Sequence, residues 1–365
     1  MKKIGREVLF LKAKNGNPRN GEGSFLRLKN GEILFVYSKF SGNDWNDECK
    51  ADIASFTSYD EGETWVDNRI IFKHDEDSRN YMCPSLLRMN NGDIGLIFLR
   101  KFKRNEGSVP CFSRSSDEGE TFTLPKKFND NELTYWVIEN DHALKLQNGR
   151  LILPANMHSK LENNEVKIIS HGLKCIFASD DDGKSWKEIT ERQDTPFPDQ
   201  SETGLQETMI YQHESGRLHA FSRTDLAFQF ECFSDDNGET WTDPVPNRFF
   251  SSPDSPLLIK KVGKYTVAVF NPVPNYTTRS NADGNTWGRT PLVCAVSEND
   301  GISFDRIFAL EDDPDNGYCY PAIIEGKDYF LVSYYHSNNS DSPLTSCKII
   351  KIYYEEIAKK TPHIS

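Results

Sequence analysis

A small set of charged and phenolic residues in this chain could bind an acidic molecule and transform it. The set comprises Arg19, Asp47, Glu207, Arg223, Arg289, Tyr318 and Tyr320. Arginine keeps its charge, and its planar fork binds a carboxylate through two hydrogen bonds. A tyrosine phenol is neutral until a neighbouring carboxylate takes its proton. An aspartate can exchange protons with a substrate when burial or neighbouring charge raises its pKa.

An eight-residue repeat, Ser-x-Asp-x-Gly-x-Thr-Trp, indicates the secondary structure that positions these residues. Four copies begin at Ser58, Ser115, Ser179 and Ser234, and a degraded copy at Ser297 has Asn in place of Asp. Asp and Ser side chains hydrogen-bond the backbone of tight turns, and glycine supplies the positive φ that such turns need. Each copy follows a short apolar run, so it predicts a hairpin turn between two strands.

A second repeat indicates how many such units the chain contains. Turn glycines with a strand-like run on either side occur at Gly31, Gly92, Gly149, Gly216, Gly263 and Gly326. These six hairpins, five of them followed by the eight-residue repeat, predict an all-β fold, a six-bladed β-propeller with the repeats between third and fourth strands. We expect one domain over residues 1–365, with the segment 7–12 closing the ring. The expected blades span approximately 19–72, 79–130, 138–196, 203–250, 253–310 and 316–356.

The order of strands in a blade separates a structural face from a face that could hold a ligand. Loops joining strands 1 to 2 and 3 to 4 leave one face of a four-stranded meander, and the remaining loops leave the other. The repeats and the turn glycines therefore share one face, and the polar residues named above lie on the opposite one. Arg79, Asp141 and His158 also lie on that opposite face, so they could line the same pocket.

The repeat is the Asp box, and its recurrence resembles that of sialidases. In that family a glutamate begins a segment like Glu-x-x-Val-x-x-Leu-x-x-Gly, with an arginine seven residues after the glycine, as in Glu207, Gly216 and Arg223. A further arginine stands eight residues before an Asp-box serine, as Arg289 does. The segment Tyr318-Cys-Tyr-Pro resembles the beginning of the family's last blade, where the nucleophile lies.

The beginning of blade one both fits and departs from the sialidase pattern. Asp47, Asp52 and Ser58 match a segment like Asp-x-x-x-x-Asp-x-x-x-x-x-Ser, in which the first aspartate is the acid/base. Sialidases, however, begin with Phe/Tyr-Arg-Ile-Pro, whereas this chain has Gly21-Glu-Gly-Ser-Phe at the matching place. Arg19 lies two residues too early and would reach the same point only through a longer loop.

The resemblance implies a retaining exo-glycosidase that releases a terminal sialic acid or a related acidic sugar through a tyrosine nucleophile. Arg19, Arg223 and Arg289 would hold the carboxylate, Tyr318 with Glu207 would form the covalent intermediate, and Asp47 would be the acid/base. Tyr320 is the alternative nucleophile, and Asp44 and Asp52 are alternatives to Asp47. Two other functions fit the same scaffold: a hydrolase or lyase acting on a uronic acid, and a glycan-binding propeller without catalysis.

The charge composition of the chain argues against two classes of binding partner. The chain has 43 basic and 55 acidic residues, a net charge of −12, which argues against binding to nucleic acid or an anionic membrane. The start of the chain has no apolar stretch of signal-peptide length, so we expect a cytoplasmic protein.

No group of His, Cys, Asp or Glu has metal-ligand spacing, so we expect no metal or other cofactor. The cysteines are scattered singly, and Cys111, Cys175, Cys232 and Cys294 fall at equivalent places in predicted third strands, as small core residues would.

Overall fold

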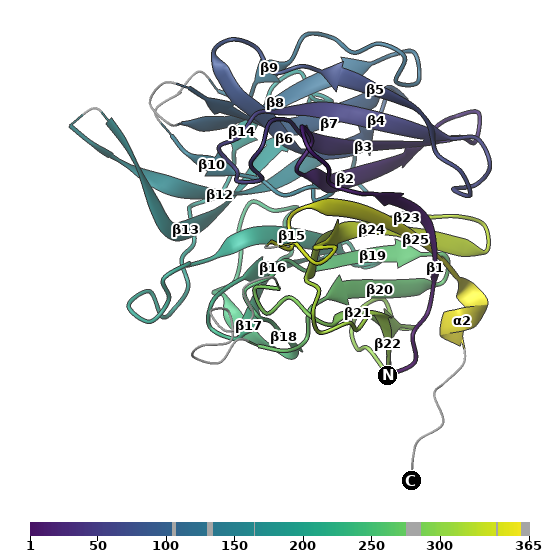
Figure 1. Cartoon of the computed structure of the whole chain (residues 1–365). Helices are drawn as coiled ribbons and strands as arrows, with labels where there is room; N and C mark the ends of the chain where they lie inside the picture. Colours follow the sequence, from purple (N-terminus) through teal and green to yellow (C-terminus); the bar gives the residue numbers. More distant parts are fainter. Residues whose placement is uncertain (104–106, 130–133, 164, 275–285, 341, 359–365) are drawn as a thin grey trace.

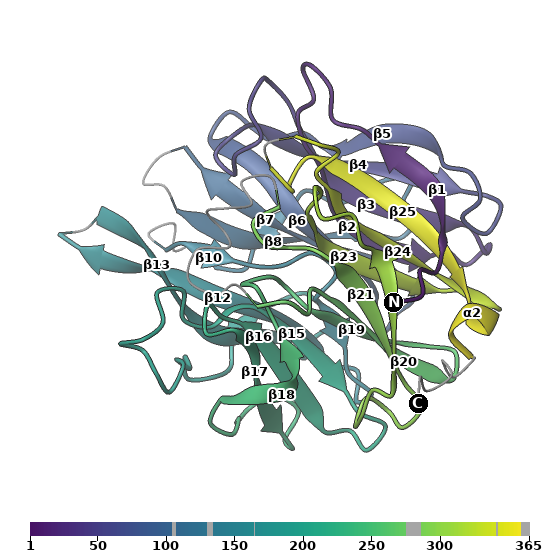
Figure 2. The same ribbon diagram turned by 60° about the horizontal axis from the view of Figure 1, so that its bottom comes forward.

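Six antiparallel sheets follow one another around a ring in the computed structural model (Figures 1 and 2). The structure describes residues 1–103, 107–129, 134–163, 165–274, 286–340 and 342–358. Five of the sheets contain four strands on one continuous path, and the sheet of blade three has one additional short strand. The six-bladed propeller predicted from the two repeats is therefore confirmed.

The strands of each blade follow the chain in order. Blade one contains β2 (Asn20–Arg27), β3 (Ile33–Phe40), β4 (Ala51–Ser58) and β5 (Val66–Phe72), and blade two contains β6 (Ser78–Arg88), β7 (Ile94–Phe102), β8 (Ser108–Ser115) and β9 (Lys126–Lys127). Blade three contains β10 (Trp136–Val137), β11 (Leu144–Lys145), β12 (Leu151–Glu162), β13 (Glu165–Ser179) and β14 (Lys187–Glu188). Blade four contains β15 (Gln206–Gln212), β16 (Leu218–Arg223), β17 (Phe228–Ser234) and β18 (Val245–Ser251). Blade five contains β19 (Leu258–Val262), β20 (Tyr265–Phe270), β21 (Leu292–Ser297) and β22 (Arg306–Glu311).

Blade six joins the two ends of the chain. Its strands are β23 (Tyr318–Glu325), β24 (Tyr329–His336), β25 (Ser346–Tyr353) and the N-terminal β1 (Arg6–Leu11), and the short helix α2 (Tyr354–Ala358) follows β25. β1 pairs antiparallel with β25, so that Leu11 lies opposite Cys347 (Figure 1). Because one sheet contains both the first and the last strand, backbone hydrogen bonds close the ring.

Each Asp box connects the third strand of its blade to the fourth. In the first copy, the Ser58 hydroxyl accepts a hydrogen bond from the amide of Gly62, and Asp60 accepts hydrogen bonds from the amide and the hydroxyl of Thr64. In the degraded copy the side-chain oxygen of Asn299 accepts the equivalent amide hydrogen bond. Asn preserves the turn because the amide oxygen replaces one carboxylate oxygen as acceptor.

One residue in each blade, within the inner strand or shortly before it, has a left-handed backbone conformation, which is uncommon outside glycine. These residues are Glu22, Cys83, Asp141, Glu207, Asp254 and Tyr320, with φ between 43° and 61°. In blades one, two, four and six the residue lies at a register shift of the first strand. Such a bulge re-aims a side chain, and here it directs polar groups toward the centre of the ring.

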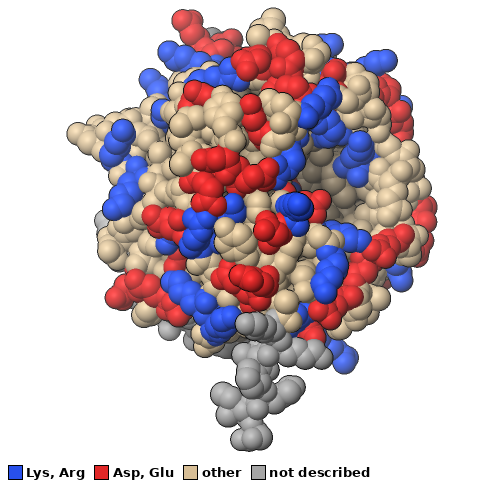
Figure 3. Space-filling view, turned by 90° about the vertical axis from the view of Figure 1, so that its right-hand side faces the viewer, with Lys and Arg blue, Asp and Glu red and all other residues tan. Residues whose placement is uncertain are grey.

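Apolar side chains fill the spaces between neighbouring sheets, and the surface mixes both charges. The four cysteines expected in the core, Cys111, Cys175, Cys232 and Cys294, are buried and unpaired. Figure 3 shows basic and acidic side chains interspersed over one face, with no broad area of a single sign. In the described part of the chain, no helix has the length and apolar character needed to cross a membrane.

Candidate active site

A cavity of about 370 Å³ at the centre of the ring brings together most of the residues predicted from the sequence. Its lining includes Asp47, Glu207, Arg223, Arg289 and Tyr320, which come from blades one, four, five and six. An inner cavity of about 70 Å³ adjoins it and shares Asp47, Glu207 and Tyr320 as lining residues. Residues far apart in the sequence thus face one shared space.

Tyr320, and not Tyr318, is the partner of Glu207. The Tyr320 hydroxyl donates a hydrogen bond of 2.7 Å to Oε1 of Glu207. The fully buried Tyr318 instead directs its hydroxyl to the carbonyl of Asp313, at 3.4 Å, and its ring packs against His336. The choice of Tyr318 was therefore wrong for this pair. Alternation alone would place both tyrosines on one face of β23, but the positive φ of Tyr320 turns its side chain toward the cavity.

Glu207 and Tyr320 form the centre of a charged network. Nη1 of Arg223 lies 2.5 Å from Oε1 of Glu207, and its Nε and Nη2 donate to Asp254 at 2.6 and 3.0 Å. Oε2 of Glu207 is buried and has no hydrogen-bond partner in the described part of the chain. Burial, together with the charge of Glu207, raises the pKa of Tyr320 well above its usual value. The phenol therefore stays protonated in the unliganded protein, beside a carboxylate that can accept its proton.

Arg289 is a buried cation without a carboxylate partner among the described residues. Its side chain is 4% exposed and donates only to Sγ of Cys319 and to the carbonyl of Asp254, each at 3.3 Å. Its Nε has no partner among those residues either, and its guanidinium lies 5.3 Å from the ring centres of Trp287 and Tyr320. Burying a charge without a counter-ion is costly, so an anion in the cavity would be stabilised by Arg289.

Arg19 reaches the site, but its charge is already paired. Its guanidinium forms an ion pair with the buried Glu22, and its Nη1 lies 2.5 Å from Oδ1 of Asp47. Its Nε donates to the Tyr335 hydroxyl at 2.7 Å, and Nη1 donates to the carbonyl of Trp45 at 3.1 Å. The structure therefore places Arg19 beside Asp47, on the wall of the inner cavity.

The pKa of Asp47 is lowered in the structure, whereas its expected role as acid/base needs a raised pKa. Partial burial by itself would raise its pKa, but the positive charges of Arg19, Lys101 and Arg289 outweigh that effect and lower the pKa to about 2. Asp47 is thus ionised at neutral pH in the unliganded protein. The expectation of a raised pKa is wrong for this state, because the sequence did not reveal that Arg19 lies against Asp47.

The three additional residues predicted to line the pocket have different positions. His158 lines the central cavity, where its buried Nε2 has no partner among the residues that the structure describes. Arg79 lines neither cavity and forms an ion pair with Glu48 at 3.2 Å. Asp141 also lies outside both cavities, where it accepts hydrogen bonds from Ser24 and the amide of Ile323 and pairs with Lys260. Asp141 thus has a structural role, because it connects blade three to the inner strands of blades one, five and six.

Several lining residues have no counterpart among the sequence predictions. They are Trp45, Asn46, Val137, Gln206, Trp287 and Leu344 in the central cavity, and Glu22, Lys101, Tyr135 and Glu139 in the inner one. Glu22 could have been found by aligning the blades, because it lies at the register shift of its blade's first strand, as Glu207 and Tyr320 do. The others have no repeated spacing that distinguishes them.

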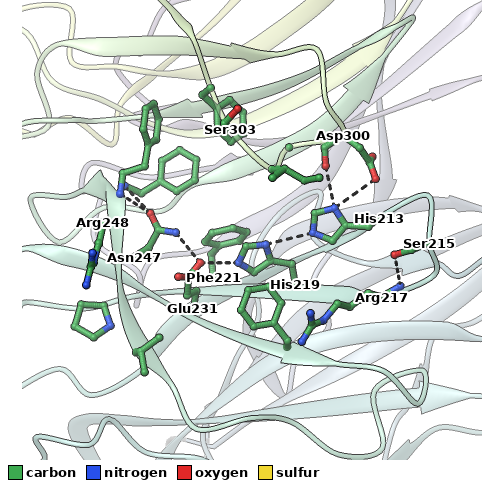
Figure 4. Close-up of a pocket in the computed structure, with 18 residues that line it drawn as sticks. His213, Ser215, Arg217, His219, Phe221, Glu231, Asn247, Arg248, Asp300 and Ser303 are labelled. Carbon is green, nitrogen blue, oxygen red and sulfur yellow. Dashed lines mark hydrogen bonds and ion pairs between the residues drawn. The ribbon is translucent and has the colours of Figure 1, made fainter.

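A larger cavity of about 1030 Å³ lies between blades four and five and contains none of the predicted residues (Figure 4). Along it, Nε2 of His213 lies 3.4 Å from Nδ1 of His219, and Nε2 of His219 lies 2.8 Å from Glu231. Asn247 also donates to Glu231, at 2.6 Å. These polar groups satisfy one another, so we assign no chemistry to this cavity. Among the residues that the structure describes, no three His, Cys, Asp or Glu side chains are grouped as metal ligands would be.

Comparisons with known proteins agree with this architecture. The leech intramolecular trans-sialidase, solved with 2,7-anhydro-Neu5Ac, superposes with a TM-score of 0.73 at 15% identity over 98% of this chain and 71% of its own. The Ruminococcus gnavus intramolecular trans-sialidase gives a TM-score of 0.73 at 14% identity over 97% of this chain and 98% of its own. The Hadza microbial sialidase Hz136 gives 0.70 at 14% identity over 93% of this chain, which spans 66% of the length of Hz136. At these identities the likeness is one of fold.

Sequence comparison identifies the family directly. Curated protein sequences give no significant match to the chain. The model of the BNR repeat-like domain, in contrast, matches residues 35–333, which is most of the propeller. The chain therefore belongs to the BNR repeat-like domain family.

Proposed function

We propose that this protein is a retaining exo-glycosidase that releases a terminal sialic acid or a related acidic sugar. The observation that carries the proposal is the hydrogen bond between the Tyr320 hydroxyl and Glu207, next to the guanidinium of Arg289, which has no carboxylate partner among the described residues. A nucleophile with its base and a buried cation thus face one cavity, whose volume of about 370 Å³ lies in the lower range for small-molecule sites. The sialidase neighbours support the same reading at the level of fold.

Arg289 is the principal group that would bind the substrate's carboxylate. Its unpaired Nε and its planar fork suit a bidentate contact, and burial strengthens that contact. Arg223 lies on the same wall, and its pairing with Glu207 and Asp254 holds its guanidinium in place. A carboxylate bound there would orient the anomeric carbon toward Tyr320.

In the first step the oxygen of Tyr320 attacks the anomeric carbon while Glu207 accepts the phenolic proton. The bond between that carbon and the leaving oxygen breaks, and Asp47 gives its proton to the leaving oxygen. In the second step Asp47 removes a proton from water, and the water oxygen attacks the same carbon. The bond to Tyr320 breaks, and Glu207 returns the proton to the phenolate. Sialidases are glycosidases that use a tyrosine in place of the usual carboxylate nucleophile.

Asp47 must be protonated for the first step, although its pKa in the unliganded protein is about 2. The cations that lower it are Arg19, Lys101 and Arg289. A substrate carboxylate bound to Arg289 would offset part of this positive charge, so substrate binding should raise the pKa of Asp47. Asp47 would then take up the proton that it needs as an acid only when an acidic sugar is bound.

The decisive experiment measures release of methylumbelliferone from its sialic-acid glycoside and from a panel of uronic-acid glycosides. The wild type and the Tyr320→Phe, Glu207→Gln and Tyr318→Phe variants should be compared. We expect turnover of the sialoside that the first two substitutions abolish and the third leaves intact. Turnover of uronosides alone would assign the protein to another acidic sugar. Binding of glycans without any turnover would indicate a glycan-binding propeller.

A further inference from the structure

Glu139 is a buried carboxyl group on the wall of the inner cavity. Its residue is 3% exposed, and the amide of Asn140 donates a hydrogen bond of 2.8 Å to Oε1. No Lys, Arg or His of the described residues forms an ion pair with it. Burying a carboxylate without a counter-ion is costly, so the group avoids that cost by keeping its proton.

The charged neighbours of Glu139 strengthen this conclusion. Glu22 pairs with Arg19, Glu207 pairs with Arg223, and both acidic side chains line the same cavity as Glu139. Burial, followed by the negative charges of Glu207 and Glu22, raises the pKa of Glu139 well above its usual value.

The lysine of the inner cavity does not neutralise Glu139. Nζ of Lys101 lies 3.2 Å from both the carbonyl of Asp47 and a carboxylate oxygen of Glu48, and 5.3 Å from the ring centre of Tyr135. The remaining titratable groups on the wall are Arg19, Asp47, Cys83 and Tyr320. Arg19 is already paired, as described above, so the wall has no free cation for a second anionic group.

The two cavities therefore differ in the groups that they can accept. Asp47, Val137, Glu207, Tyr320 and Leu344 line both, so a sugar ring in the central cavity can direct a substituent into the inner one. Arg289 offers the central cavity a cation that has no carboxylate partner among the described residues. The inner cavity offers the hydroxyl of a neutral carboxylic acid among apolar side chains such as Met82 and Leu99.

We propose that Glu139 is a specificity-determining residue that binds, as a neutral carboxylic acid, a small uncharged polar substituent of the substrate ring. The inference rests on the proposed function, because it assumes that a sugar acid occupies the central cavity. It names the substrate class more closely: a sugar acid with a single negative charge, bearing a hydroxyl or acylamino group on the side that faces Glu139. A carboxylate, sulfate or phosphate on that side would be rejected, because it would meet Glu22 and Glu207.

Enzyme kinetics with Glu139→Gln and Glu139→Leu test whether Glu139 contacts a substituent of the substrate ring. The substrates are methylumbelliferyl sialosides from which one ring substituent at a time has been replaced by hydrogen. Gln is neutral and can both donate and accept, so it should keep kcat/KM within about threefold, whereas Leu should lower it about tenfold or more, mainly through KM. On the one analogue that lacks the contacted substituent, kcat/KM of the Leu variant should equal that of the wild type. Equal effects of Leu on every analogue would overturn the proposal.

Infrared difference spectroscopy at pH 7 tests the protonation state without any turnover. The wild type should show the carbonyl band of a protonated carboxyl that Glu139→Gln lacks, and its absence would overturn the proposal. If the wild type hydrolyses no sialoside, binding of the same compounds by calorimetry replaces the kinetics. If the infrared band is present but no compound binds, the substituent contact and the proposed function are both rejected. The conclusion that Glu139 is a neutral acid would then still hold. Thermal melting of both variants confirms that the readouts come from folded protein.

Discussion

The hydroxyl of Tyr320 lies 2.7 Å from Oε1 of Glu207, although 113 residues separate them in the sequence. The same carboxylate oxygen lies 2.5 Å from Nη1 of Arg223. A phenol, its base and a cation thus meet at one oxygen atom, and the first prediction tests this arrangement.

Tyr320→Phe should lower kcat about 100-fold or more, because it removes the atom that attacks the anomeric carbon. Tyr318→Phe is the matched control, since Tyr318 lies two residues away on the same strand and its hydroxyl makes a long hydrogen bond of 3.4 Å to the carbonyl of Asp313. We expect its kcat to stay within about threefold of the wild type. Steady-state kinetics on the methylumbelliferyl sialoside decide between the two tyrosines, and a larger loss with Tyr318→Phe would refute the assignment.

Arg289→Lys should weaken binding of a sugar acid about tenfold, because an ammonium group keeps the charge but lacks the planar fork. Arg289→Met should weaken it further, since no cation replaces the guanidinium. Arg79→Met is the control, because Arg79 lies outside both cavities and pairs with Glu48. Isothermal titration with the free sugar acid measures each affinity, and equal losses at Arg79 and Arg289 would contradict the anion site.

Asp47 should contribute to stability in a pH-dependent way. Its folded-state pKa of about 2 lies below its usual value, so the contribution is present at pH 5 and above and disappears as the pH falls toward 2. Asp47→Asn should therefore lower Tm at pH 6 and have a progressively smaller effect toward pH 2.5. The side chain is 54% exposed, so solvent screens the pair and the shift should be modest. A Tm difference that does not change with pH would mean that Arg19 does not stabilise the charged form.

Asp236→Ala should lower the free energy of unfolding by about 1–2 kcal/mol and leave kcat unchanged. Asp236 accepts hydrogen bonds from the amide and hydroxyl of Thr240 and from the hydroxyl of Ser234, all within one Asp box on the face opposite the cavity. Asp235→Ala is the matched control, because that side chain is 74% exposed and should change stability by less than about 0.5 kcal/mol. Urea unfolding measures both, and a loss of activity with Asp236→Ala would place the boxes in the functional site.

Much of the site was predictable because it depends on spacing within repeats. Glu207, Arg223 and Arg289 were placed by their distances from turn residues, and the structure brings all three to the central cavity. Arg79 and Asp141 lie on the predicted face as well, but their side chains pair with Glu48 and Lys260 instead of lining the cavity. Position on a face can be read from strand order, whereas the direction and partner of a side chain cannot.

The amino-acid sequence by itself determined the number of blades, the order of their strands and the face that holds the site. Those properties follow from local turn chemistry, which each Asp box and turn glycine specifies within a few residues. Tertiary structure alone decided that Tyr320 and not Tyr318 meets Glu207, that Arg19 ionises Asp47, and that Glu139 has no counter-ion among the described residues. These outcomes depend on bulges and on charges contributed by different blades. No local pattern specifies them, because they exist only once the ring is closed.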